Sequence, residues 1–84
     1  MELRDEIIEK IIERASQLFG KDPDELDENT RFKEDLEAKS VNYVQITTVL
    51  EDEYDVEVGY MPFSKNKTIG EAADFVLGLL EEEE

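Results

Sequence analysis

The chain is one small domain of 84 residues, with nine basic and 24 acidic side chains, a net charge of −15, and no cysteine or histidine. The missing residue types exclude disulfides, thiolate nucleophiles, Cys/His zinc sites and a Ser-His-Asp triad. The negative charge disfavours nucleic acid and membranes as partners and favours basic proteins. Self-repulsion also favours a monomer. We expect a cytoplasmic location, because the sequence has no cysteine, no signal-peptide pattern and no apolar run long enough to span a membrane.

Apolar residues at helical spacing predict a long first helix that ends at Gly20. Its apolar stripe consists of Leu3, Ile7, Ile8, Ile11, Ile12, Ala15, Leu18 and Phe19. A long loop over residues 20–39 follows, with a short helical turn expected near 32–36. We expect three apolar anchors to pin this loop to the core: Leu26, Phe32 and Leu36.

A second helix is predicted from about Ser40 to Tyr54. Its β-branched residues leave a strand as the alternative, but the apolar positions do not alternate with a period of two. We expect an inward face that consists of Val41, Val44, Val49, Leu50 and Tyr54. This prediction places Tyr43 and Ile46 off the apolar stripe.

The remainder of the chain predicts a short element and a last helix. Residues 55–67 are irregular, with at most one short helical turn, and Thr68 with Glu71 forms a capping box. The core face of the last helix consists of Ala72, Phe75, Val76, Leu79 and Leu80. Four glutamates at its negative end predict a bundle over 1–80 and a frayed acidic tail over 81–84. The predicted fold is all-α: a small four-helix bundle with a long first loop and a short or irregular third helix.

Ser40 is the candidate functional residue, because it stands where the long loop gives way to a helix. Unpaired backbone N–H groups at a helix start suit a phosphate. On residue type alone, the alternative is a plain N-cap serine. We predict no catalytic residue beside it and no metal site, since the acids over 22–28 lack the glycine and final glutamate of a calcium loop.

The order of elements and three motifs resemble the acyl carrier protein family over nearly the whole chain. The motifs are Phe32-Lys33-Glu34-Asp35-Leu36-Glu37-Ala38-Lys39-Ser40-Val41, Leu50-Glu51-Asp52-Glu53-Tyr54 and Thr68-Ile69-Gly70-Glu71-Ala72. The resemblance implies a carrier that is not an enzyme, with 4′-phosphopantetheine from coenzyme A esterified to Ser40. The thiol of this arm would hold an acyl group as a thioester, which makes sense of the missing cysteine.

The resemblance also implies partners and a pocket. The partners are a phosphopantetheinyl transferase and acyl-loading ligases or synthases with basic docking patches. The residues expected to contact them are Glu34, Asp35, Glu37, Lys39, Val41, Glu51, Asp52 and Glu53. The acyl chain is expected between helices two and four, in a pocket made by Val44, Leu50, Ala72 and Val76. A separate group either contacts a partner or closes the core: Tyr43, Tyr60, Met61 and Phe63.

Several positions depart from the family pattern. Around the serine the departures are Glu37 for Gly, Lys39 for Asp and Val41 for Leu. Asn42 and Gln45 occupy positions that usually carry docking acids, and the segment 59–67 contains lysines in place of acids. Because such changes alter the choice of partner, we hypothesise a specialised carrier for dedicated lipid or secondary-metabolite synthesis, with a fatty acyl, polyketide or aminoacyl cargo. The alternative is an arm-free acidic helical adaptor in which Ser40 is only a cap.

Overall fold

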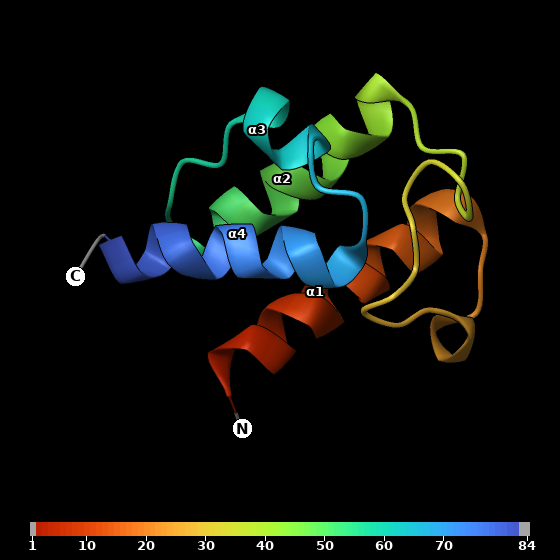
Figure 1. Ribbon diagram of the computed structural model, residues 1–84, viewed down its shortest axis with the longest axis horizontal. Helices are drawn as coiled ribbons and strands as arrows, with labels where there is room; N and C mark the ends of the chain where they lie inside the picture. Colours follow the sequence, from red (N-terminus) through yellow and green to blue (C-terminus); the bar gives the residue numbers. More distant parts are fainter. Residues whose placement is uncertain (1, 83–84) are drawn as a thin grey trace.

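The computed structural model describes residues 2–82 and confirms the all-α prediction (Figure 1). Its helices are α1 (Leu3–Phe19), α2 (Ser40–Tyr54), α3 (Tyr60–Ser64) and α4 (Ile69–Glu82), with a single 3₁₀ turn, η1 (Pro23–Glu25), in the first loop. No strand occurs within the described residues, where the only pairing of β type is a single bridge between Arg31 and Thr68. The short third helix agrees with the predicted irregular segment.

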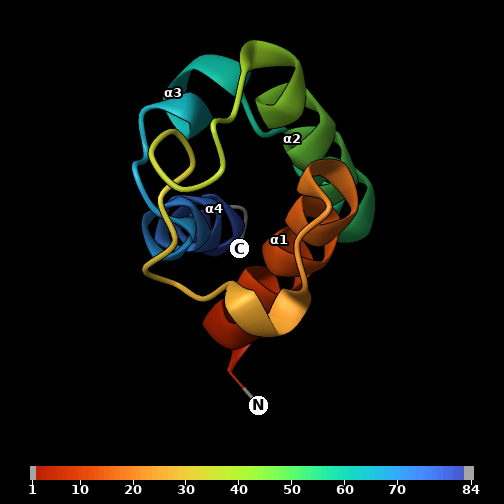
Figure 2. The same ribbon diagram turned by 90° about the vertical axis from the view of Figure 1, so that its right-hand side faces the viewer.

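The helices surround one interior (Figure 2). Helix α1 packs against both α2 and α4, and α3 packs against α2. Phe32 of the long loop is fully buried at the centre, with its ring centroid 5.5 Å from Tyr43 and 6.0 Å from Phe63. Leu26 and Leu36 are also buried, so all three predicted anchors hold the loop on the core.

The inward face of α2 differs from the prediction. Its buried residues are Tyr43, Ile46, Thr47 and Leu50. Val41 is 58% exposed and Val44 is 46% exposed, so their predicted inward placement is wrong. Thr47 completes the buried i, i+3, i+4, i+7 stripe because its hydroxyl donates to the Val44 carbonyl at 3.0 Å. Apolar residues on both sides of α2 give two possible stripes, and only packing chooses between them.

The helix ends follow their local signals. Gly20 ends α1 in the left-handed conformation, with φ 66°. Thr68 Oγ1 accepts from the Glu71 N–H at 3.1 Å, and the Glu71 carboxylate accepts from the Lys67 N–H at 2.9 Å. The glutamate thus reaches one residue further back than in the predicted capping box. Helix α4 continues to Glu82, two residues beyond the predicted end of the bundle, and residues 83–84 of the predicted tail lie outside the described part.

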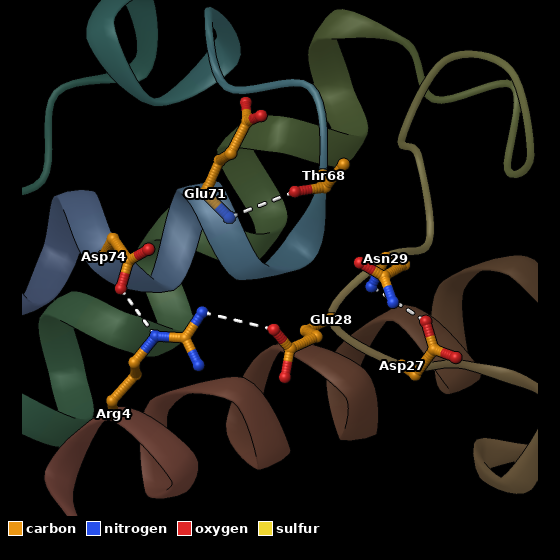
Figure 3. A network of polar contacts seen from close by, with 7 residues as sticks. All are labelled: Arg4, Asp27, Glu28, Asn29, Thr68, Glu71 and Asp74. Carbon is orange, nitrogen blue, oxygen red and sulfur yellow. Dashed lines mark hydrogen bonds and ion pairs between the residues drawn. The ribbon is translucent and has the colours of Figure 1, made fainter.

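A polar network joins the start of α1 to α4 and to the first loop (Figure 3). Arg4 Nε lies 2.6 Å from Asp74 Oδ1, and Arg4 Nη2 lies 3.4 Å from Glu28 Oε1. Beside it, the buried Gly70 donates its N–H to the Glu28 carbonyl at 2.8 Å. The loop that leads to Ser40 is therefore fixed at both its apolar anchors and its backbone.

Candidate functional site

Ser40 is the first residue of α2, and it is exposed. Its Oγ accepts a hydrogen bond from the phenol of Tyr60, with 3.1 Å between the two oxygens. Tyr60 is the first residue of α3, so the candidate site lies where the starts of these two helices come together. A hydroxyl in this position is accessible to a modifying enzyme and lies at the positive end of the α2 dipole.

The Ser40 hydroxyl is not the cap of α2. Lys39 occupies the N-cap position, with extended backbone angles, and its N–H donates to Asn42 Oδ1 at 2.9 Å. Within the described contacts, the Ser40 Oγ bonds to Tyr60 alone. The plain N-cap interpretation of this serine is therefore wrong, because Lys39 holds the N-cap position. Asn42 supports the helix start in a different way: its side chain reaches back to the N–H of the N-cap residue. An asparagine three residues into a helix is the sequence signal for this role, in the place where a capping box has Glu or Gln.

Glu37, just before the site, has φ 54°, in the left-handed region. Glycine takes this conformation at little steric cost, whereas a side chain is strained there. The glycine expected here from the resemblance would therefore suit the backbone that this chain keeps with a glutamate. The substitution leaves a carboxylate exposed near the serine.

Four of the predicted partner-contact acids have partners inside the chain. Glu34 Oε2 lies 2.5 Å from Arg31 Nη1, and Asp35 Oδ2 accepts from the Arg31 N–H at 2.8 Å. At the other end of α2, Glu51 accepts from the Val58 N–H at 2.8 Å.

Glu53 is the fourth, with its Oε1 2.7 Å from Lys10 Nζ. This hydrogen bond and the charge of Glu53 raise the pKa of Lys10. Of the remaining predicted contacts, Glu37, Lys39, Val41 and Asp52 are exposed. Part of the acidic surface of α2 is thus engaged in holding the fold, which sequence alone does not reveal.

The predicted apolar groups divide between core and surface. Leu50, Ala72 and Val76 are fully buried in one cluster, whereas the exposed Val44 lies off their side of α2. Tyr43 and Phe63 also belong to the core, and burial raises the pKa of Tyr43.

Met61, 66% exposed, follows Tyr60 just as the exposed Val41 follows Ser40. Ser40 and Tyr60, whose hydroxyl groups are in contact, therefore each have an exposed apolar neighbour in the sequence.

Among the described residues, no cluster of acidic side chains is arranged to hold a metal ion. No described helix has the length and apolar character to cross a membrane.

Comparisons with known proteins agree with this geometry. Residues 9–76 match the family described as "Phosphopantetheine attachment site". An acyl carrier protein of Lactobacillus acidophilus is 36% identical over 72 residues, which are 86% of this chain and 90% of the relative. One of Rubrobacter xylanophilus is 35% identical over 74 residues, 88% of this chain and 91% of the relative. One of Sulfurovum sp. is 32% identical over 76 residues, 90% of this chain and 96% of the relative.

Proposed function

Because this chain belongs to the acyl carrier protein family, we propose that Ser40 is the residue that carries its 4′-phosphopantetheine arm. The family is one of carriers, not of enzymes, and the arm supplies the thiol to which an acyl group is bound as a thioester. The observation that supports the assignment to Ser40 is its exposed hydroxyl at the start of α2, which is not committed to capping because Lys39 holds the N-cap position. The residues around it fit a phosphate.

Three features of the chain favour a phosphodiester at this position. The start of α2 carries the positive end of the helix dipole, which stabilises an anion. The Tyr60 phenol, 3.1 Å from Ser40 Oγ, is a donor within reach of an oxygen attached there. Lys39, exposed and next to the serine, adds a positive charge to a chain of net charge −15. Lys39 thus compensates the phosphate charge that the usual aspartate would repel.

We further propose that this carrier serves a dedicated lipid or secondary-metabolite pathway, as a cytoplasmic monomer. Its docking face presents Glu37 and Asp52 as exposed acids, with Lys39 and Val41 beside the serine. Asn42 is committed to the helix start, so it offers less to a basic partner than an acid would. This surface fits a loading ligase or synthase whose basic patch differs from that of the common fatty acid enzymes. The transferase that attaches the arm is expected to approach the same face.

Intact-mass measurement tests the attachment site. The chain is incubated with coenzyme A, Mg²⁺ and a broad-specificity phosphopantetheinyl transferase, beside Ser40→Ala and Ser64→Ala. The parent and Ser64→Ala should gain one phosphopantetheine, and Ser40→Ala none. No gain in the parent with several transferases would favour the arm-free adaptor; a gain only after Lys39→Asp would show that Lys39 hinders recognition.

Acyl loading tests the dedicated role. Once the arm is attached, the common fatty acid synthesis enzymes should load and elongate on this chain more slowly than on a standard carrier. Asn42→Asp with Gln45→Glu should restore part of the rate, because both changes return acids to the docking face. Equal rates on the parent and the standard carrier would refute the specialisation.

A further inference from the structure

A basic cleft lies between the first loop and the segment after α3, with one wall from α2. Its volume is about 380 Å³, within the range of small-molecule sites. Four of the nine basic side chains of the protein line it, whereas Glu34 is the only acidic side chain in the lining among residues 2–82. The basic residues are Arg31, Lys33, Lys65 and Lys67. In a chain of net charge −15, this concentration of positive charge marks the cleft as a place for an anion.

Tertiary structure brings these cations together. The bridge between Arg31 and Thr68 places two segments side by side, and the Phe32 N–H donates to the Lys67 carbonyl at 3.0 Å. Glu34, the one acid in the lining, is already paired with Arg31 at 2.5 Å. Within the described contacts, no carboxylate pairs with the three lysines of the cleft. Their charge is therefore available to a ligand.

The cleft lies near the candidate attachment site, and Tyr43 connects the two. Its wall on α2 is Tyr43, which follows Ser40 by three residues, a rise of about 4.5 Å along the helix. The ring of Tyr43 lies 6.2 Å, centroid to centroid, from Tyr60, whose phenol contacts the Ser40 hydroxyl. A chain of a phosphate, a pantoyl group, a β-alanyl unit and a cysteamine is much longer than one helical turn. A group at its end can thus reach the cleft.

We propose that this cleft binds the carboxylate of an acidic acyl group carried on the arm, such as a dicarboxylic acid linked through one end. The inference rests on the proposed attachment at Ser40 and adds a second site, which holds the free end of an acidic cargo. Lysine ammonium groups attract the free carboxylate, and the partly apolar wall at Tyr43 accommodates the methylene groups. Because the lysines are exposed, the attraction is screened by salt. A neutral acyl group of equal length gains nothing from this site.

The test compares two cargoes that differ in one charge. Ser40 is loaded with arms that end in a succinyl or a butyryl group, each through a stable amide in place of the thioester, and backbone amide shifts are measured by NMR. Succinyl, but not butyryl, should shift the amides of Lys33, Lys65 and Lys67. Lys67→Gln should reduce these shifts, whereas Lys21→Gln, the same charge change away from the cleft, should not. The shifts should also fade from about 0.01 M to 1 M salt, as the Debye length drops from ~30 Å to ~3 Å.

Each other outcome overturns the proposal at a defined step. Equal shifts from both cargoes, or shifts confined to the apolar residues between α2 and α4, would show that the carboxylate does not select the cleft. Equal shifts from free succinyl-pantetheine at the concentration of the protein would make the cleft a general anion site instead of a cargo site. Absence of any mass gain at Ser40 would remove the proposed function itself, whereas a loaded arm without cleft shifts removes this inference alone.

Discussion

Gly70 and Gly78 lie in the same helix, and we expect replacement by alanine to have opposite effects at the two positions. Gly70 is buried in the second position of α4, and its N–H donates to the carbonyl of Glu28 in the first loop. A Cβ there would lie 3.0 Å from the Glu28 carbonyl oxygen, 3.1 Å from Glu28 Cβ and 3.3 Å from Arg4 Nη2. At Gly78 a Cβ would meet no atom of the described residues within 4 Å. The two substitutions thus share their chemistry and differ only in packing.

The magnitudes follow from two opposing effects. Alanine in a helix interior is more favourable than glycine by about 1 kcal/mol. Overpacking against fixed neighbours costs about 1–3 kcal/mol, and the Glu28 oxygen is fixed because it accepts the Gly70 N–H at 2.8 Å. Gly70→Ala should therefore lower the free energy of unfolding by about 1 kcal/mol, a net of the two effects. Gly78→Ala should raise it by as much as ~1 kcal/mol.

Urea unfolding followed by circular dichroism measures both changes, with thermal melts as a second readout. For a domain of this size, 1 kcal/mol corresponds to a change in Tm of about 4–8 °C. If Gly70→Ala stabilised the protein as much as Gly78→Ala, the close approach of α4 to the loop would be refuted. If both destabilised it, the helix-propensity part of the reasoning would fail.

Four further outcomes are expected. Asn42→Ala should cost about 1 kcal/mol of stability, because the Lys39 N–H at the helix start loses its acceptor. The control is Asp52→Ala, an exposed position on the same helix, and equal effects in urea unfolding would show that Asn42 does not stabilise the helix start. Glu37→Gly should gain about 0.5–1 kcal/mol, because it relieves the positive φ; an unchanged unfolding curve would argue against strain there. Burial, and next the charge of Glu6, raise the pKa of Tyr54 to about 12. The neutral phenol of Tyr54 therefore contributes to the free energy of unfolding. Since the pKa of an unfolded tyrosine is about 10, this stabilisation is fully present below pH ~10 and is lost as the pH rises toward ~12. The difference in stability between the parent and Tyr54→Phe should change over that pH range and stay constant below it. Added salt should raise the Tm by screening a net charge of −15, and a Tm that falls with salt would mean that ion pairs such as Lys10–Glu53 outweigh the repulsion.

Local signals in the sequence predicted where the helices begin and end. Gly20 supplies a left-handed end, and Thr68 supplies a side-chain acceptor at a helix start, so each specifies its role through its own chemistry. The predicted bounds of α2, Ser40 to Tyr54, agree with the structure for the same reason. The position of Ser40 between loop and helix was likewise predictable, because it depends on neighbours in the sequence.

The buried face of α2 and the role of Asn42 needed the structure. Val44 and Ile46 are both β-branched and apolar, yet one is 46% exposed and the other fully buried. Apolar periodicity compares the faces of a helix only by residue type, so it does not separate these two residues. It also misses Thr47, which is buried because its hydroxyl donates a hydrogen bond within the helix, a contact that hydropathy scales do not include. The family pattern alone presents Asn42 as a lost docking acid, whereas in the structure its side-chain oxygen accepts from the Lys39 N–H at the helix start.

The sequence by itself determined the family, the four helices and the serine at the start of α2, because each of these is encoded over a few consecutive residues. Only the tertiary structure decided which surface charges are free. Glu53 is paired with Lys10, 43 positions away in the sequence, and the lysines of the cleft meet through the bridge between Arg31 and Thr68. Charge is a property of a residue, but its neutralisation depends on which distant segments the packing of the core brings within about 4 Å.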